Sequence, residues 1–416
     1  MPSRLEQLPP ELVDAISPSL SLDTIRSLRL SSRTVQQTTF PEFRRRFFSR
    51  ISTCLDSYSL NRLSEMASKP ELASAVRRLD IDLCLPTPSF KQDLQEVEIY
   101  KERLPLKKPP QVDNADFVLA LEVLFNNINK KRHQEQVIGT FSQTLQKFGN
   151  LKELRFLSHD RYYRKDLHSD VQSGCLSIVF KALVQSGVTL EHFATSDRET
   201  ESGSFTRTAI LPWSNPTISV SLQKVLPEAL QNIKSMDVHL WPPRNVEIPR
   251  ENTFTQFLAA ATNIQSLSLV FDGEGGHYSK EVIHSLSHIP PLTKLSSFNL
   301  RACSFNQDDL RFFAVHHRQF LRRMDLQCVN LHKGTWKELF EHFQHDLREL
   351  EFLNLDLLGQ GRNKRRVIFD WGDFDGLFGM VMDAHSEEET RTMKEMLNEV
   401  IEHHEVHDPN QPPDNP

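Results

Sequence analysis

The sequence predicts an α/β protein in which three short amino-terminal helices precede an irregular solenoid of alternating strands and helices. Three observations predict this fold class. Helix-start signals containing proline fall between residues 5 and 48, apolar residues recur at relative positions 1, 4 and 6 along most of the chain, and helical apolar stripes separate these triplets. The 416 residues are 38% hydrophobic and 25% charged, which is an ordinary composition for a folded soluble chain.

The amino-terminal helices come first. Leu8-Pro9-Pro10-Glu11-Leu12 marks a helix start, because a proline in the first helical turn loses no hydrogen bond. Leu12 and Ile16 then lie four residues apart, on one face of that helix. Helices this short bury little apolar surface among themselves, so we expect some of it to contact a partner. The alternative is that the segment packs on the rest of the chain as an end cap.

The apolar triplets carry the repeat. They begin, in chain order, at Val76, Leu151, Ile233, Ile264, Leu295, Leu321 and Leu347. The last five starts are 31, 31, 26 and 26 residues apart, and the segments between them read as helices. Thr335, for example, fits a helix cap, and an apolar stripe follows from Trp336 to Phe343. Neither piece buries its apolar face alone, so the units are expected to stack. A non-repeating α/β domain with coincidental spacing is the alternative.

These two regions resemble two known families. From Ile264 to Leu357 the chain resembles the leucine-rich-repeat family, whose pattern is L-x-x-L-x-L-x-x-N/C-x-L. Residues 5–48 resemble an F-box, in which the matching residues are Leu8, Pro9, Glu11, Leu12, Ile16, Leu20 and the run Leu28-Arg29-Leu30-Ser31-Ser32-Arg33. The whole resembles a divergent fungal-type F-box protein with a leucine-rich-repeat-like carboxy-terminal region. The expected domains are an F-box (1–48), an irregular repeat region (49–357) with insertions at 86–111 and 197–217, a cap (358–402) and a disordered tail (403–416).

The resemblance implies a function. An F-box protein of this kind is a substrate-recognition adaptor of a Skp–cullin–F-box ubiquitin ligase. A Skp-type adaptor, and through it a cullin, would dock on Leu8, Pro9, Leu12, Ile16, Leu20 and Leu28. The repeats would hold a target protein, and catalysis would come from proximity alone. The alternative is a leucine-rich-repeat scaffold that binds protein without a ubiquitin-ligase role.

The predicted strands indicate where a target would bind. Positions 4 and 6 of each triplet face the core, so positions 3, 5 and 7 face the opposite surface. The candidate contacts on that surface are Arg155, Asp237, Asn299, Arg301, Arg323, Asp325 and Glu351. These side chains suit a polar or charged protein segment better than an apolar ligand. An ordinary solvated face is the other interpretation.

Several other functions are disfavoured, and we expect neither an enzyme nor a cofactor. None of the five cysteines lies in a CxxC motif, and no set of Cys and His has zinc-finger spacing. His403 and His407 would bind metal only as a helical pair, and a solvated tail is favoured. The basic runs Arg44–Arg46 and Arg362–Arg366 could be nuclear-import signals or anion-binding patches, and solvated faces are favoured.

The net charge and the hydropathy pattern bear on partners and location. Lys and Arg number 49 against 55 Asp and Glu, a net charge of −6, so neither nucleic acid nor an anionic membrane is an expected partner. The sequence lacks a signal-peptide core and any apolar run of transmembrane length. The protein is therefore expected inside the cell, in the cytoplasm, the nucleus or both.

Overall fold

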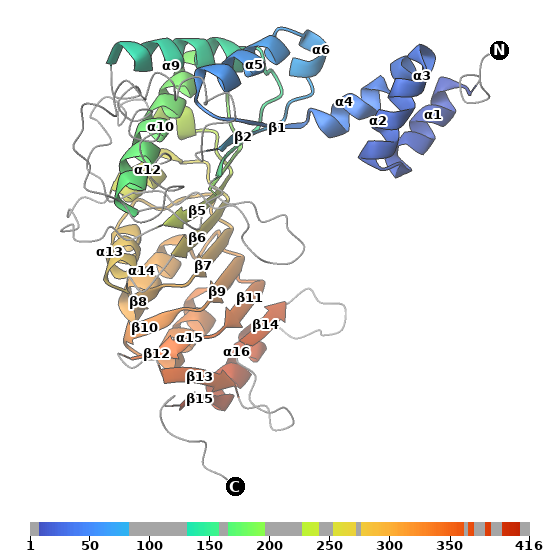
Figure 1. Ribbon diagram of the computed structural model, residues 1–416. Coiled ribbons are helices and arrows are strands. Elements are labelled where there is room, and N and C mark those ends of the chain that lie inside the picture. Colours follow the sequence, from blue (N-terminus) through green and yellow to red (C-terminus); the bar gives the residue numbers. More distant parts are fainter. Residues whose placement is uncertain are drawn as a thin grey trace, which may run out of the picture. The chain divides into compact units, whose positions relative to one another are not determined.

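The structure is a computed structural model that describes residues 8–82, 131–157, 165–195, 227–240, 253–271, 276–361, 365–369, 379–383 and 393–407. The chain forms two compact units. Figure 1 labels their helices and strands. Unit 1 comprises Met1–Leu157 with Lys181–Thr189, and unit 2 comprises Ser158–Phe180 with Leu190–Pro416. The predicted insertions at 86–111 and 197–217 lie outside the described residues.

Unit 1 begins with a bundle of short helices. Its elements are α1 (Pro10–Ile16), the 3-10 turn η1 (Ser17–Ser19), α2 (Leu22–Ser31), α3 (Arg33–Thr38) and α4 (Phe40–Phe47). Prolines in the first turns of α1, η1 and α4 start these elements, and the Ser21 and Ser32 side chains cap α2 and α3. The helices pack on one another around Ile25 and Val35. This is a small core, so much apolar surface stays outside it.

The rest of unit 1 is a three-stranded parallel sheet with helices. It contains β1 (Arg50–Thr53), α5 (Ser57–Ala67), α6 (Pro70–Ala73), β2 (Arg78–Asp82), α9 (Lys131–Gln146) and β3 (Glu153–Leu157). The order β1-β2-β3 follows the chain, and α5 packs on α9. Leu79 and Leu154 are fully buried neighbours in this sheet. Helix α10 (Lys165–Ser186) contributes residues to both units.

Unit 2 is built on a longer sheet. Its strands are β4 (His192–Ala194), β5 (Ser235–Leu240), β6 (Ser266–Phe271), β7 (Ser297–Arg301), β9 (Arg323–Gln327), β11 (Phe352–Asp356) and β14 (Gly379–Asp383). The first six are parallel and follow chain order, while β14 is antiparallel to β11. The helices are α12 (Thr253–Ala260), α13 (Gly276–Ser287), α14 (Gln307–His317), α15 (Trp336–Asp346) and α16 (Met393–His403). Figure 1 shows α13 and α14 along one side of these strands.

A second sheet in unit 2 consists of shorter strands. It runs β15 (His404–His407), β13 (Arg365–Phe369), β12 (Gly359–Gln360), β10 (Asn330–Lys333) and β8 (Ser304–Asn306). A residue with positive φ links each long strand to its short one: Ala302 after β7, Cys328 after β9 and Leu357 after β11. The Ala302 and Cys328 amides donate to the next strand, at Gln327 and Asp356. These hydrogen bonds compensate for a backbone conformation that non-glycine residues disfavour.

A buried histidine, His317, helps to join α14 to the segment before it. Its Nε2 accepts a hydrogen bond from the Leu292 amide (3.0 Å), and its Nδ1 bonds the Phe313 carbonyl (2.7 Å). Because a carbonyl only accepts, Nδ1 carries the proton and the ring is neutral. Burial of the ring is the main cause that lowers the pKa of the His317 imidazole below its ordinary value of 6.5.

The predicted fold class, a three-helix F-box followed by an irregular leucine-rich-repeat solenoid, is wrong. The structure is an α/β fold in which nine parallel strands, three in unit 1 and six in unit 2, alternate with helices in a Rossmann-like arrangement. The amino-terminal segment has four α-helices instead of three. The error has a physical cause, because a short apolar triplet marks a buried parallel strand in any alternating α/β fold and does not identify a repeat.

The strand order also bears on function. Within the described part of each unit, neighbouring parallel strands succeed one another along the chain. Open α/β sheets bind small ligands in the crevice where the strand order reverses. Among the described strands of each unit, no such reversal occurs.

The last predicted triplet is out of register. Leu347, Leu350 and Phe352 satisfy the pattern, but so do Leu350, Leu353 and Leu355, and the sequence alone does not choose between them. The structure chooses the second set, since Leu353 pairs with Met324 and Leu355 with Leu326, and both leucines are fully buried. Glu351 therefore precedes β11, and Asn354 stands opposite Asp325.

Candidate functional site

The exposed face of α1 is the first candidate surface. Leu12 and Ile16 lie one turn apart on α1 and are 50% and 46% exposed. Of the other residues predicted to dock a Skp-type adaptor, Pro9 is exposed, whereas Leu8, Leu20 and Leu28 are half-buried. We call Leu8, Pro9, Leu12 and Ile16 the α1 face. Leu30, near the end of α2, is 89% exposed but was not among the predicted contacts.

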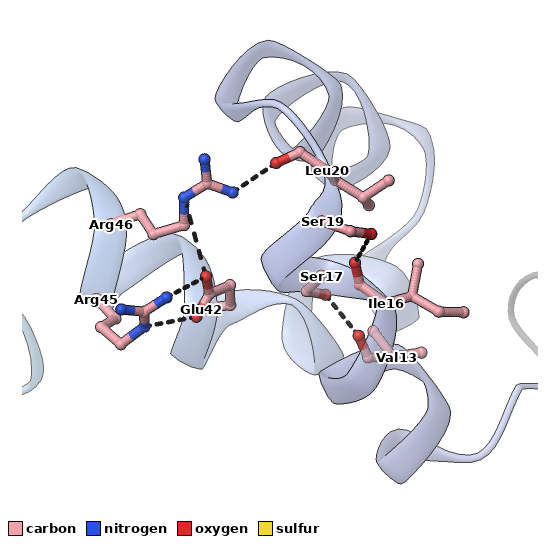
Figure 2. A network of polar contacts seen from close by, with 8 residues as sticks. All are labelled: Val13, Ile16, Ser17, Ser19, Leu20, Glu42, Arg45 and Arg46. Carbon is pink, nitrogen blue, oxygen red and sulfur yellow. Dashed lines mark hydrogen bonds and ion pairs between the residues drawn. The ribbon is translucent and has the colours of Figure 1, made fainter. Parts of the chain in front are cut away.

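Polar contacts hold the end of α1 in place, as Figure 2 shows. The hydroxyls of Ser17 and Ser19 donate to carbonyls of the preceding turn, at Val13 and Ile16, each at 2.7 Å. These bonds add side-chain donors to carbonyls at the end of the helix, where the Val13 carbonyl also accepts from the Ser17 amide. In Figure 2 the Ile16 side chain points away from α4. Ile16, a predicted contact, thus projects from a helix end whose carbonyls these serines bind.

Helix α4 is tied to the same region. The Arg46 guanidinium donates to the Leu20 carbonyl at 2.5 Å, across the bundle. Arg45 binds the Glu42 carboxylate through two hydrogen bonds of 2.7 and 2.6 Å. That hydrogen bonding, together with the charges of Arg45 and Arg46, lowers the pKa of the Glu42 carboxyl below its ordinary value. Arg45 and Arg46, two residues of the basic run of α4, therefore make contacts that stabilise the bundle.

An arginine–aromatic cluster joins α2 to α4. The Arg29 guanidinium lies 4.2 Å from the ring centroid of Phe43 and 5.2 Å from that of Phe40. It also donates to the Gln36 carbonyl at 2.8 Å, and Phe43 stacks on Phe47 at 5.1 Å. Cation–π contacts of this kind stabilise by about 0.5–2 kcal/mol. Arg29, one of the residues that match the F-box pattern, thus packs within the bundle.

The second candidate surface is a row of polar side chains across three strands of unit 2. Asp325 accepts hydrogen bonds from the Asn299 amide (3.3 Å), the Asn354 amide (2.9 Å) and the Gln327 amide (3.2 Å). Asn299, Asp325 and Asn354 stand directly opposite one another on β7, β9 and β11. We call these four residues the Asp325 row. All four side chains are half-buried.

The other predicted target contacts lie near this row or apart from it. Asp237 is half-buried on β5, two strands away from Asn299 in the same register line. Arg301 stands opposite Gln327, and the Arg323 guanidinium lies 4.2 Å from the Phe352 ring centroid. Glu351 forms an ion pair with Arg322 at the start of the strands, so it does not join the row.

Arg155 belongs to unit 1, unlike the other six predicted target contacts. It lies beside Glu153 on β3, with which it forms an ion pair, and opposite Asp80 on β2. Asp80 in turn pairs with the buried Arg78, with N–O distances of 2.6 and 3.1 Å. The structure therefore gives unit 1 its own charged sheet face, which the strand pattern did not distinguish from that of unit 2.

Sequence reasoning missed Asn354 and Gln327 as members of the Asp325 row. Gln327 occupies position 7 of its triplet and was on the predicted surface, but it was not selected as a contact. Asn354 is at position 5 of the last triplet when that triplet begins at Leu350. The prediction began the triplet three residues earlier, at Leu347, and so did not place Asn354 on the predicted surface. The apolar spacing allows the last triplet to begin at Leu347 or at Leu350, and no local sequence signal favours Leu350.

The cysteines and the carboxy-terminal histidines offer little chemistry. Burial raises the pKa of the Cys303 thiol well above its ordinary value, and that of Cys328 is raised as well, so neither favours a thiolate. His403 ends α16 and His407 lies in β15, so they do not form the helical pair that metal binding required. Strand β15 also falls within the predicted tail, where residues 404–407 pair with β13. In the described residues, no three metal-ligating side chains gather, and no helix is long and apolar enough to cross a membrane.

Comparison with known proteins does not identify the chain. No protein-family model matches it. No curated protein matches it significantly either. Function is therefore inferred from the two surfaces described above, the α1 face and the Asp325 row.

Proposed function

We propose that this chain is a non-catalytic adaptor of a Skp–cullin–F-box ubiquitin ligase. In this proposal the α1 face docks a Skp-type adaptor, and the Asp325 row with its flanking arginines contacts a target protein. The observation that carries the proposal is the exposure of Leu12 and Ile16 on one face of an ordered helix. Such an adaptor acts inside the cell and accelerates transfer by holding the target near the ligase.

The energetics of the α1 face support docking. Complete burial of a leucine or isoleucine side chain stabilises by about 1.5–3 kcal/mol relative to full exposure. Leu12 and Ile16 are about half exposed, so each has roughly 1 kcal/mol left to contribute when a partner covers it. Together, the two side chains contribute roughly 2 kcal/mol when a partner covers both.

The Asp325 row supports a polar target. Its carboxylate is already oriented by three amides, so binding to it costs little side-chain ordering. Arg301 and Arg323 lie on the same strands as Asn299 and Asp325, and both are at least partly exposed. A protein segment with carboxylates and amides complements this mixture of donors and acceptors.

The first experiment measures binding of the full-length chain to a purified Skp-type adaptor by biolayer interferometry. We expect binding by the natural chain and its loss in the double variant Leu12→Asp, Ile16→Asp, because a charge placed in an apolar interface is left unpaired. The matched control is Leu357→Asp, which changes a leucine of similar exposure (45%) in unit 2 and should leave binding unchanged. Failure of the natural chain to bind would refute the proposal.

A protein-binding scaffold without a ubiquitin-ligase role is the second candidate. The four-helix bundle favours it, since an F-box was predicted to have three helices. In that case the Asp325 row binds its target as before, but no Skp-type adaptor is retained. Pull-down of the target by a chain that does not bind the Skp-type adaptor would distinguish this candidate from the first.

A further inference from the structure

Two histidines on α13 lie side by side on the surface of unit 2. His284 and His288 are one helical turn apart, and their ring centroids are 4.5 Å apart with an interplanar angle of 52°. Both side chains are exposed. Helix α13 packs against α14, as Figure 1 also shows. The pair therefore combines solvent access with a rigid support.

The first histidine is oriented by a buried carboxylate. His284 Nδ1 lies 2.8 Å from Asp309 Oδ1, and Asp309 is buried in the first turn of α14. A carboxylate oxygen accepts, so Nδ1 donates its hydrogen to it. The second carboxylate oxygen accepts from the Asn306 amide at 3.0 Å. With both oxygens engaged, the carboxylate holds the His284 ring in one orientation and tautomer.

The second histidine is oriented by the helix itself. His288 Nδ1 lies 2.8 Å from the His284 carbonyl and 2.9 Å from Ser287 Oγ. The Ser287 hydroxyl already donates to the same carbonyl at 2.7 Å, so its oxygen is able to accept. Nδ1 of His288 is therefore the donor, as in His284. When each ring is neutral, this tautomer places the lone pair on Nε2.

This hydrogen-bond pattern is that of metal-binding histidines. A metal-ligating imidazole donates its second ring N–H to a carboxylate or to a backbone carbonyl, and here one histidine does each. Two histidines at positions i and i+4 of a helix are also the spacing with which helices bind zinc. With Zn–N bonds of about 2.0–2.1 Å, tetrahedral geometry needs the two Nε2 atoms roughly 3.4 Å apart, and the two ring centroids here are 4.5 Å apart.

We propose that His284 and His288 form a two-histidine site for a borderline divalent cation, with Zn²⁺ as the representative ion. Nε2 of each ring is a ligand, water fills the remaining positions, and Asp309 is a positioning residue. The described residues offer no group of three ligands, so binding is readily reversible. Lys280 and Glu281, one turn earlier on α13, carry opposite charges and together leave the local charge balanced.

The experiment is a calorimetric titration of the full-length, tag-free chain with ZnCl₂, repeated with MgCl₂. We expect one Zn²⁺ equivalent to bind through this pair, and no corresponding binding of Mg²⁺, which prefers oxygen ligands. His284→Ala and His288→Ala should each abolish that equivalent. His316→Ala, which removes an exposed histidine from α14, is the matched control and should retain it.

Two further readouts keep the proposal falsifiable if one variant folds poorly. His288→Ala leaves the contact between His284 and Asp309 intact, so a loss of Zn²⁺ binding in that variant with an unchanged thermal unfolding curve supports the site. Asp309→Asn should weaken Zn²⁺ binding by about 10–100-fold. Unchanged Zn²⁺ binding in both histidine variants overturns the site, and an unchanged affinity in Asp309→Asn overturns the positioning role.

Discussion

Replacing Asp325 by alanine should destabilise unit 2 measurably. The change removes the acceptor of three amide hydrogen bonds, from Asn299, Asn354 and Gln327. A hydrogen bond to a charged group contributes about 1.5–3 kcal/mol when buried and less when water can replace it. These side chains are half-buried, so we take about 0.5–1 kcal/mol for each bond. For three bonds, the free energy of unfolding should fall by about 1.5–3 kcal/mol.

The assay is urea unfolding of the full chain followed by circular dichroism, with the slope of the transition compared between variants. A double-mutant cycle of Asp325→Ala with Asn354→Ala should give a coupling free energy of about 1 kcal/mol. Ser297→Ala, on the same face at the start of β7, is the control and should change stability by less than about 0.5 kcal/mol. A loss in Asp325→Ala no larger than that of the control, or no coupling, would refute the reasoning.

The remaining predictions concern other buried polar groups and one strained turn. Burial lowers the pKa of the His317 imidazole below 6.5, so on acidification the unfolded chain takes up this proton at a higher pH than the folded chain does. Stability should therefore be lost as the pH falls from about 6.5 through the folded-state pKa. Thermal unfolding between pH 7.5 and 5 checks this, and the midpoint of His317→Gln should depend less on pH. Trp336→Phe removes the 2.7 Å hydrogen bond from the indole to the buried Gly359 carbonyl and should cost about 1–3 kcal/mol, measured by urea unfolding; an unchanged midpoint would contradict it. Gly334→Ala should destabilise by at least about 1 kcal/mol, because φ is +91° and a Cβ would lie 2.1 Å from the Gln307 side-chain oxygen; a thermal midpoint equal to that of the natural chain would show that the turn relaxes.

Features that depend on residues a few positions apart were predictable. The Thr335 side chain caps α15 by accepting from the Glu338 amide at 3.2 Å, as its sequence spacing predicted. The apolar stripe that begins at Trp336 is buried along α15, and the proline-marked start of α1 is found at Pro10. The exposure of Leu12 and Ile16 likewise agrees with the expected apolar face. Each of these features is set within one or two helical turns.

The function-related surfaces depend on contacts between distant residues, and these escaped prediction. The pair His284–Asp309 joins residues of different helices, although the spacing of His284 and His288 was visible in the sequence. A search for histidines four residues apart would have flagged that pair, but it would not have found the buried carboxylate that orients it. The Asp325 row required the register of three strands, and that register was known only from the sheet.

By itself, the sequence determined local features such as the start of α1 at Pro10 and the Thr335 cap of α15, since prolines and capping residues act through local hydrogen bonds. Only the tertiary structure decided the fold class, the frame of the last strand and the positive-φ turns at Ala302, Cys328 and Leu357. The physical reason is that hydrogen bonds between strands, and the burial that comes with them, select one register among several that satisfy the same apolar spacing.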